Sequence, residues 1–198
     1  AERKAAKKES EKAEKMNEEF FANEDPNFKI TAIPEKWNKA SAVIINQKYE
    51  FQYMRDGGDI TYTEKVRRRV KLHDKAAVEE FSYFYYTKGE NNSVGIKIIK
   101  PSGKTIDVST ADAVEVADNI PDIFKALYSY RDKYMKLAVP DLETGDIIDY
   151  YYYTLLEYKS KYSINRSFQD FRYPMGSTYP IMNQELTFVV DKGFFINF

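Results

Sequence analysis

From Ser41 to Leu72, apolar and polar residues alternate along the chain, which is the pattern of strands with one buried face. In the first run, the apolar face carries Val43, Ile45, Tyr49, Phe51 and Tyr53, and the other face carries Ile44, Asn46, Lys48, Glu50 and Gln52. After the turn sequence Asp56–Asp59, the core-facing set is Ile60, Tyr62, Val66, Val70 and Leu72. Pairing Tyr53 with Ile60 keeps both apolar faces together, so the pattern predicts an antiparallel hairpin.

The polar face of the second strand is expected to point to water. It carries Thr61, Thr63, Lys65, Arg67, Arg69 and Lys71. A solvated sheet face is the simpler interpretation of this basic ladder, and Lys at exposed positions also discourages edge-to-edge association. The alternative is a surface for anions or for an acidic partner.

Further short strands follow along the chain. Strand patterns cover Ala77–Thr87, Val94–Lys100, Thr105–Val108, Lys133–Val139, Ile147–Tyr158 and Gln184–Val190. A short helix is expected near 121–130, because Pro121 precedes apolar residues at helical spacing. Short strands joined mainly by hairpin turns predict an all-β, mainly antiparallel β-sandwich.

The first 36 residues differ from the rest of the chain. Residues 1–22 are rich in Ala, Lys and Glu and lack Pro and Gly, which predicts a charged helical leader. Residues 23–36, which Pro26 and Pro34 interrupt, are expected to form a linker. Residues 37–198 then make up the predicted β-sandwich domain.

The leader helix has only a thin apolar stripe, formed by Ala13, Met16 and Phe20. We therefore expect it to pack weakly or to serve as a spacer. The chain opens on Ala1 without Met and ends on Phe198 inside a strand pattern. The expectation is a piece of a longer protein, with a signal peptide removed and a further C-terminal domain to follow.

The composition of the chain favours β structure and excludes several classes of function. The 17 Tyr and 13 Phe among 198 residues favour β structure, since aromatic side chains suit the pleated, half-buried surface of a sheet. A net charge of -1 lacks the long-range attraction to phosphate, so no nucleic-acid partner is expected. The chain has no Cys, which excludes disulfides and Cys-ligated metals, and no apolar run approaches about 20 residues, so no membrane span is expected.

Two runs of consecutive aromatic residues, Tyr83–Tyr86 and Tyr150–Tyr153, must point to both faces of their strands. The simpler interpretation is that a leader helix, a loop or a neighbouring domain covers the outer rings. Exposed tyrosines could instead stack on sugars or anchor a protein interface. The candidate interaction surface combines these tyrosines with the basic ladder: Tyr83, Tyr85, Tyr151, Tyr153, Lys65, Arg67 and Arg69.

The sequence predicts no catalytic, cofactor or metal site. The single His73 lies at the end of a strand next to Asp74, where a surface residue is a simpler interpretation than a catalytic base. Two turns contain acidic groups that offer oxygen ligands for Ca²⁺: Asp56 with Asp59, and Asp141 with Glu143 and Asp146. Their spacing matches no EF-hand loop, and turn formation explains the same residues.

Three segments share an order of strands and turns. IKIIKPSGKTIDV (Ile96–Val108) is an apolar strand, a Pro-polar-Gly-basic turn and a second strand. RDKYMKLAVPDLETGDIIDYYYYT (Arg131–Thr154) is a strand, a Pro-x-Leu-x-x-Gly-Asp turn and an aromatic strand, and FQDFRYPMGSTYPIMNQELTFVV (Phe168–Val190) is an aromatic pair, a Pro and an alternating strand. Together they resemble the domain of unknown function found N-terminal to bacterial transglutaminase-like domains, over about Trp37 to Phe198.

The turns of this resemblance contain residues with structural roles: Pro101, Gly103, Pro140, Leu142, Gly145 and Asp146. Pro ends a strand because it lacks an N–H, and Gly accepts a positive φ without penalty. Leu142 is expected to plug the end of the sandwich, and Asp146 to cap its turn by accepting backbone N–H groups.

The resemblance implies an immunoglobulin-like β-sandwich, usually followed by a papain-like catalytic domain, in a bacterial protein that is periplasmic or on the cell surface. Such a catalytic domain needs a Cys nucleophile, which this chain lacks. The expected function is a non-catalytic accessory module without a cofactor. Its expected partner is a transglutaminase-like domain in the same polypeptide or in another protein. The alternative is a carbohydrate-binding module that uses Tyr83, Tyr151 or Tyr153.

Overall fold

The computed structural model describes residues 11, 15–22, 25–56, 59–89, 91–116, 133–158 and 175–193. The strands are β1 (Ala42–Asp56), β2 (Asp59–Leu72), β3 (Tyr83–Lys88), β4 (Asn92–Ile99), β5 (Thr105–Val108), β6 (Val114–Val116), β7 (Lys133–Ala138), β8 (Ile147–Tyr158) and β9 (Ile181–Val190). The helical elements are α2 (Lys75–Phe81) and the 3-10 turns η1 (Pro26–Lys29), η2 (Glu35–Trp37) and η3 (Thr110–Asp112), and residues 15–21 are helical as well.

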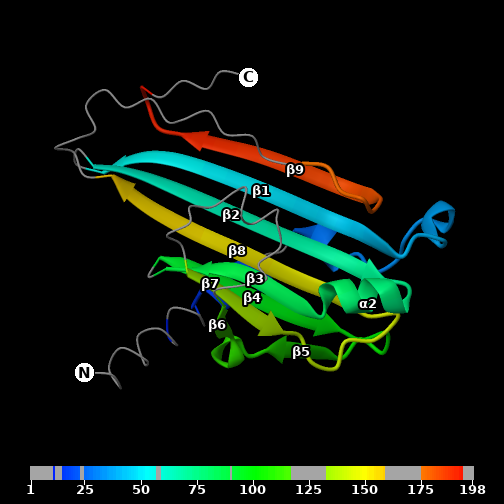
Figure 1. The fold of residues 1–198 in the computed structure, drawn as a ribbon. Coiled ribbons are helices and arrows are strands. Elements are labelled where there is room, and N and C mark those ends of the chain that lie inside the picture. The colour runs from blue at the N-terminus through cyan, green and yellow to red at the C-terminus, as the bar shows by residue number, and fades with distance from the viewer. Residues whose placement is uncertain are drawn as a thin grey trace.

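These strands form two sheets that pack together (Figure 1). The large sheet has the order β5-β4-β8-β2-β1-β9, and the small sheet has the order β3-β7-β6. The predicted all-β, sandwich-like fold is therefore confirmed. The short helix expected near 121–130 falls outside the described residues. In the part of the chain that the structure describes, no helix is long and apolar enough to cross a membrane.

The predicted hairpin of β1 and β2 is present, but its register differs by two residues from the expectation. Tyr53 pairs with Tyr62, and Ile60 pairs with Arg55 instead of Tyr53. Because side chains alternate with a period of two, this shift keeps the apolar faces together. A bulge between Ile44 and Asn46 also interrupts the alternation.

The bulge changes which residues share a face of β1. Ile44 pairs with Val70 and so lies on the face of Tyr49, whereas Val43 pairs with Lys71 on the opposite face. The strict alternation assigned Val43 and Ile44 the other way round. One inserted residue is enough to exchange the two faces, and the apolar character of both residues concealed it.

Strand β9 departs from the hairpin pattern, because it pairs in parallel with β1. The register matches Ile44 with Ile181 and Tyr53 with Val190. All the other described strand pairs are antiparallel, so the sheet is mainly antiparallel as expected. The strand starts at Ile181, three residues before the predicted Gln184.

The main core lies between one face of the large sheet and the layer formed by the small sheet and α2. Its buried members include Ile44, Val70, Leu72, Ala77, Ile96, Ile98, Leu137, Ile148 and Tyr150. The Phe84 ring of β3 meets the Tyr150 ring of β8 edge to face, at 4.7 Å between centroids. Burial of each of these aliphatic side chains contributes roughly 1.5–3 kcal/mol, so this layer fixes how the two sheets sit on each other.

The segment Ala77–Thr87, predicted as one strand, begins inside the helix α2, and the strand β3 starts only at Tyr83. Asp74 caps this helix, since its Oδ1 accepts a hydrogen bond from the Ala77 N–H at 3.0 Å. An Asp cap followed by Lys, Ala and Glu, which are good helix formers, outweighs the weak alternation of the sequence there.

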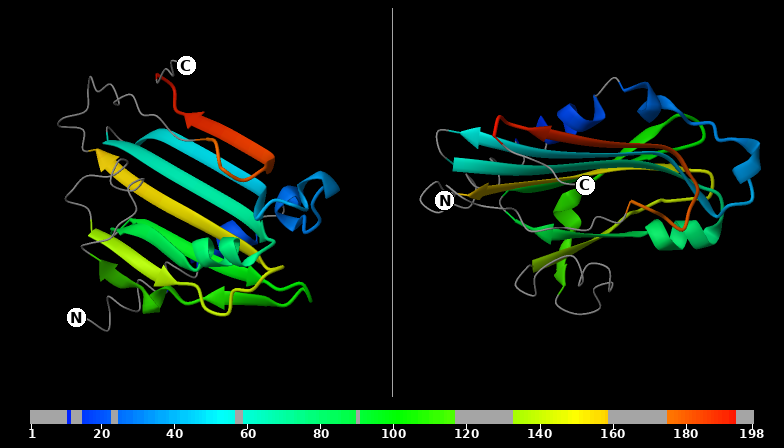
Figure 2. Two further views of the ribbon diagram at one scale, coloured as in Figure 1. Left: turned by 45° about the vertical axis from the view of Figure 1, so that its right-hand side comes forward. Right: turned by 90° about the horizontal axis from the view of Figure 1, so that it is seen from above.

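The opposite face of the large sheet is covered by the N-terminal segment, by which we mean residues 15–22 and 25–29. In the view from above (Figure 2, right), this segment and α2 lie on opposite sides of the sheet. Phe20 and Phe28 are both buried. The expectation that the leader packs weakly is therefore wrong for its last turn.

Candidate functional site

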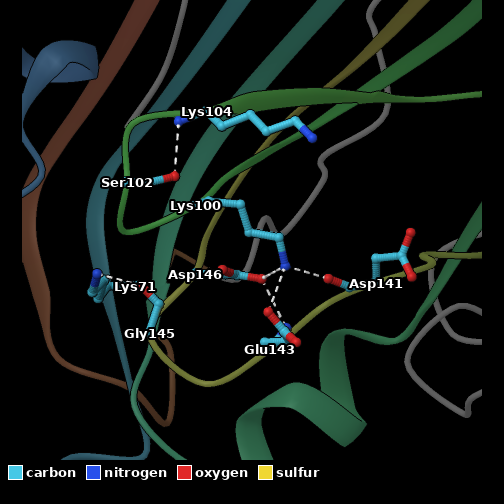
Figure 3. Close-up of polar contacts among 8 residues, drawn as sticks. All are labelled: Lys71, Lys100, Ser102, Lys104, Asp141, Glu143, Gly145 and Asp146. Atoms are coloured by element: carbon cyan, nitrogen blue, oxygen red, sulfur yellow. Dashed lines mark hydrogen bonds and ion pairs between the residues drawn. The ribbon is translucent and has the colours of Figure 1, made fainter.

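The two turn motifs meet at one end of the sandwich, around the ammonium group of Lys100 (Figure 3). Lys100 directly follows β4, and its Nζ lies 2.8 Å from Asp146 Oδ2 and 3.0 Å from Glu143 Oε2 in the loop before β8. It also donates to the backbone oxygen of Asp141, whose carboxylate turns away. Residues 41 to 46 positions apart in the sequence thus form one cluster of Lys100, Asp141, Glu143 and Asp146, here called the lysine clamp.

Backbone geometry explains why these residue types stand in the lysine clamp. Gly103 and Gly145 have φ of 86° and 95°, as their roles in the turns predicted. A Cβ at Gly145 would lie 3.4 Å from the Pro101 ring, so the two turns touch. Asp146 is buried and accepts the Glu143 N–H at 2.8 Å, which confirms the predicted cap.

The lysine clamp is also tied to β2 and to the core. Lys71 donates to the carbonyl oxygen of Gly145, and the Gly145 N–H donates to the Leu72 carbonyl at 2.8 Å. Leu142 is partly buried against the main core, as expected for a residue that closes the end of the sandwich. The clamp therefore holds the ends of β2, β4 and β8 together.

The ammonium of Lys100 also bears on the calcium alternative at this turn. It lies among the oxygens of Asp141, Glu143 and Asp146, where a bound cation would have to sit. Within the described residues, no group of three His, Cys, Asp or Glu side chains is arranged to hold a metal ion. The chain supplies its own cation here, and the arrangement favours a structural role.

Replacing Asp146 by Ala is expected to lower the free energy of unfolding by about 2 kcal/mol, because the Lys100 ammonium loses its buried carboxylate partner and the Glu143 N–H loses its acceptor. Glu143→Ala is the matched control, since that side chain is 75% exposed and its loss should cost under about 0.5 kcal/mol. Urea denaturation of both variants measures the difference. Equal costs would show that Asp146 does not anchor the turn.

The lysine clamp should also show in the pH dependence of stability. The hydrogen bond to Asp146, followed by the one to Glu143, raises the pKa of Lys100 above its ordinary value of 10.5. A raised pKa in the folded state adds stability that is fully present below the unfolded value and is lost as pH rises through the folded value. Lys100→Met should thus be less stable than the unaltered chain near pH 8, and the gap should narrow as the pH rises beyond the ordinary lysine value of 10.5.

His73 lies near a Ser and an Asp, but the three side chains are not arranged for catalysis. Its Nδ1 is 2.7 Å from the Ala40 carbonyl oxygen. The Ser41 hydroxyl donates to Asp74, the cap of α2, and this bond is the main reason that the pKa of Asp74 is lowered. A nucleophile would need its hydroxyl on the imidazole, so the geometry favours a structural role for all three residues.

The basic ladder is buried for Arg67 and Arg69, so the expectation of a solvated face is wrong for them. Arg67 forms a two-pronged pair with Asp149, with Nε 3.0 Å from Oδ1 and Nη2 2.9 Å from Oδ2. Arg69 Nη1 lies 3.6 Å from the same carboxylate. Lys65 is less buried, and hydrogen bonding and charge from Glu19 and Glu50 outweigh burial and raise its pKa.

Sequence reasoning did not identify Asp149 as the partner of these two bases. The signal was present, because Asp149 interrupts the apolar run of β8. Strand register places it opposite Arg69 and on the face of Arg67, but the sequence does not give the register.

Tyr151 is also buried, so it is not part of an exposed surface. Its ring stacks on Phe20 at 4.2 Å between centroids, and its hydroxyl donates to Asn17 Oδ1 at 2.8 Å. Burial raises the pKa of Tyr151. Tyr153 is half-buried, with the Phe20 ring edge-on at 6.5 Å. The interpretation that the leader helix covers these rings is confirmed for both.

The other two tyrosines of the candidate interaction surface, Tyr83 and Tyr85, lie on the outer face of the small sheet. Tyr83 is 51% exposed and Val114 is 58% exposed, while Tyr85 is half-buried. Tyr85 and Val114 both pair with Lys136, so all four residues share this face. The Lys136 ammonium lies 3.9 Å from the centre of the Tyr83 ring, which gives the face an aromatic and cationic character.

The family model described as "Domain of Unknown Function with solved-structure structure (DUF3857)" matches residues 58–198. The chain is similar to a crystal structure titled as a "putative protease" from Parabacteroides distasonis, with a TM-score of 0.56 and 16% identity over 78% of this chain. That likeness shows the fold alone, and the chain spans 30% of the length of that protein. No curated protein matches the chain.

Proposed function

The chain belongs to the DUF3857 family, and we propose that it is a non-catalytic accessory module that docks or orients a transglutaminase-like catalytic domain. The proposal places this domain in an exported bacterial protein, in the periplasm or at the cell surface. The turn motifs that resemble domains found before transglutaminase-like enzymes support this context. The match to part of a much longer protein is compatible with it.

The observation that carries the proposal is the exposed outer face of the small sheet. Described elements pack on both faces of the large sheet, with the small sheet and α2 on part of one side and the N-terminal segment on the other. By contrast, Tyr83 and Val114 remain more than half exposed. Exposed aromatic and aliphatic side chains on one face are typical of a docking surface.

The chemistry of the described residues supports a non-catalytic role. His73 faces a backbone carbonyl, and the carboxylates of Glu143 and Asp146 are engaged in the lysine clamp. The Cys nucleophile of a papain-like enzyme is absent from the sequence, so the proposal assigns catalysis to a neighbouring domain.

The glycan-binding alternative is favoured less. Tyr151, one of its three platforms, is buried under Phe20. Tyr83 stays exposed, but the Lys136 ammonium already sits over its ring at 3.9 Å. A sugar would have to displace that cation from the ring or use the other side of it. Among the residues that the structure describes, no second exposed ring is stacked beside it to extend the platform.

The test of the docking proposal starts from the natural gene that encodes this chain. If a Cys-His-Asp domain is encoded with it, that domain is produced separately and its binding to this chain is measured by calorimetry. The double variant Tyr83→Ser with Val114→Ser should weaken binding by about tenfold or more, because two central apolar contacts are lost. Leu186→Ser is the control, since Leu186 is a similarly exposed side chain (44%) of β9 in the other sheet.

Two results would contradict the proposal at different levels. If neither the natural polypeptide nor the neighbouring genes contain a transglutaminase-like domain, the proposed partner does not exist. If Leu186→Ser weakens binding as much as the double variant does, the outer face of the small sheet is not the docking surface.

A further inference from the structure

The N-terminal segment is joined to the large sheet by side chains. Tyr151 donates to Asn17, Arg67 donates to the Phe20 carbonyl, and Lys65 pairs with Glu19 at 3.1 Å. Among the described residues, its backbone-to-backbone hydrogen bonds stay within the segment, such as the one from the Ala22 N–H to the Glu18 carbonyl. The contact therefore has the character of a peptide docked on a surface, not of a strand added to a sheet.

The chemistry of the two sides is complementary. The segment offers aromatic rings and carboxylates, and the sheet offers cations around Tyr151. The Arg67 guanidinium lies 4.0 Å from the centre of the Phe28 ring, and the Lys97 ammonium lies 4.6 Å from that of Phe21. Lys48 Nζ is 3.9 Å from Asp25. Cation–π contacts and opposite charges thus recur along the whole contact.

The sheet side carries more positive charge than its own carboxylates balance. Arg67 and Arg69 share the single carboxylate of Asp149, and Arg69 Nε is buried with no hydrogen-bond partner among the described residues. Burial is the first cause that lowers the pKa of Arg69, and the charge of Arg67 adds to it. The carbonyl of Phe20, near the negative end of the short helix, offsets part of this excess.

The segment is held on the sheet by side-chain contacts, and among the described residues it makes no backbone-to-backbone hydrogen bond to a strand. Its order therefore depends on the docked contacts, and such elements open at a lower free energy than the core. Opening would uncover a basic and aromatic face centred on Arg67 and Tyr151.

We propose that this face of the large sheet is a docking site for a polypeptide segment with adjacent aromatic residues flanked by carboxylates. The N-terminal segment occupies the site in the same chain, and a partner segment of this chemistry displaces it. The site is distinct from the outer face of the small sheet, so it does not rest on the proposed docking of a catalytic domain.

The test uses a fluorescent peptide with the sequence Lys15–Lys29 as the probe and the full chain as the receptor. In the variant Phe20→Ser with Phe28→Ser, the chain's own segment loses its two buried rings, while every sheet residue is unaltered. The peptide should bind this variant at least about tenfold more tightly than the unaltered chain, because the tethered segment no longer competes at high effective concentration. Added salt should weaken the binding.

Two controls distinguish specific docking from non-specific binding and from loss of folding. The same peptide with both phenylalanines replaced by Ser should bind the variant at least about tenfold more weakly than the original peptide does. If near-ultraviolet circular dichroism shows that the double variant is not folded, Glu19→Lys replaces it, because this change reverses one exposed ion pair and leaves the rings in place. Equal binding of the peptide to the unaltered and released chains, or binding to neither, would overturn the proposal.

Discussion

Gly95→Ala is expected to lower the free energy of unfolding by about 3 kcal/mol, at the upper end of what overpacking costs. A Cβ at this position of β4 would lie 2.3 Å from the Tyr151 ring and 2.3 Å from Asn17 Oδ1. The ring cannot move freely, because Phe20 stacks on it at 4.2 Å between centroids. The substitution should therefore strain the strand or expel the N-terminal segment.

Gly176→Ala is the matched control, since nothing lies within 4 Å of a Cβ built there. It should change the free energy of unfolding by less than about 0.5 kcal/mol. Denaturation gives the stabilities, and hydrogen exchange at residues 17–21 shows whether the segment has left the sheet. A Gly95→Ala chain as stable as the control, with unchanged exchange, would contradict the packing described around Tyr151.

The elements that depend on local chemistry were predictable from sequence. The β1–β2 hairpin follows from alternation around a turn, and the β4–β5 hairpin follows from a Pro-x-Gly turn. Gly145 and Asp146 have the positive φ and the capping bond that their turn requires. These features need only a few consecutive residues, so the sequence contains them.

The features that depend on distant pairing were not predictable in the same way. The parallel β1–β9 pair, the bulge at Ile44 and the match of Asp149 with Arg67 each require knowledge of register. The outer positions of β2 are polar, which indicated solvent, yet the N-terminal segment covers them. The periodicity of a sequence shows which positions are polar. It does not distinguish charged residues that face solvent from charged residues that form a buried ion pair.

Gly95 offered a signal that alternation alone does not use. A Gly inside an apolar strand marks a close approach of other atoms, and here those atoms belong to Tyr151 and Asn17. Such a Gly predicts a covered face even where the neighbouring side chains are charged. The same reasoning assigns the four tyrosines of β8 to packing on both faces, and it leaves Tyr83 of the small sheet as an aromatic residue available to a partner.

Asp149→Ala is expected to have the largest effect, a loss of about 3–5 kcal/mol in the free energy of unfolding. The change leaves Arg67 and Arg69 buried side by side without their shared carboxylate. Removal of one partner from a buried pair is costly because the remaining charge is neither solvated nor compensated. The N-terminal segment should loosen as well, since Arg67 can no longer hold the Phe20 carbonyl in place.

A control variant shows whether the loss of stability is specific to this buried carboxylate or follows from the removal of any carboxylate. Asp107→Ala removes a 73% exposed carboxylate that lies 3.5 Å from Lys97, and it should cost less than about 0.5 kcal/mol. Adding Arg67→Met and Arg69→Met to Asp149→Ala should recover at least about half of the loss, because apolar side chains of similar length carry no uncompensated charge. If the triple variant is less stable than Asp149→Ala alone, packing by the arginines outweighs their buried charge, and the electrostatic account of this face is wrong.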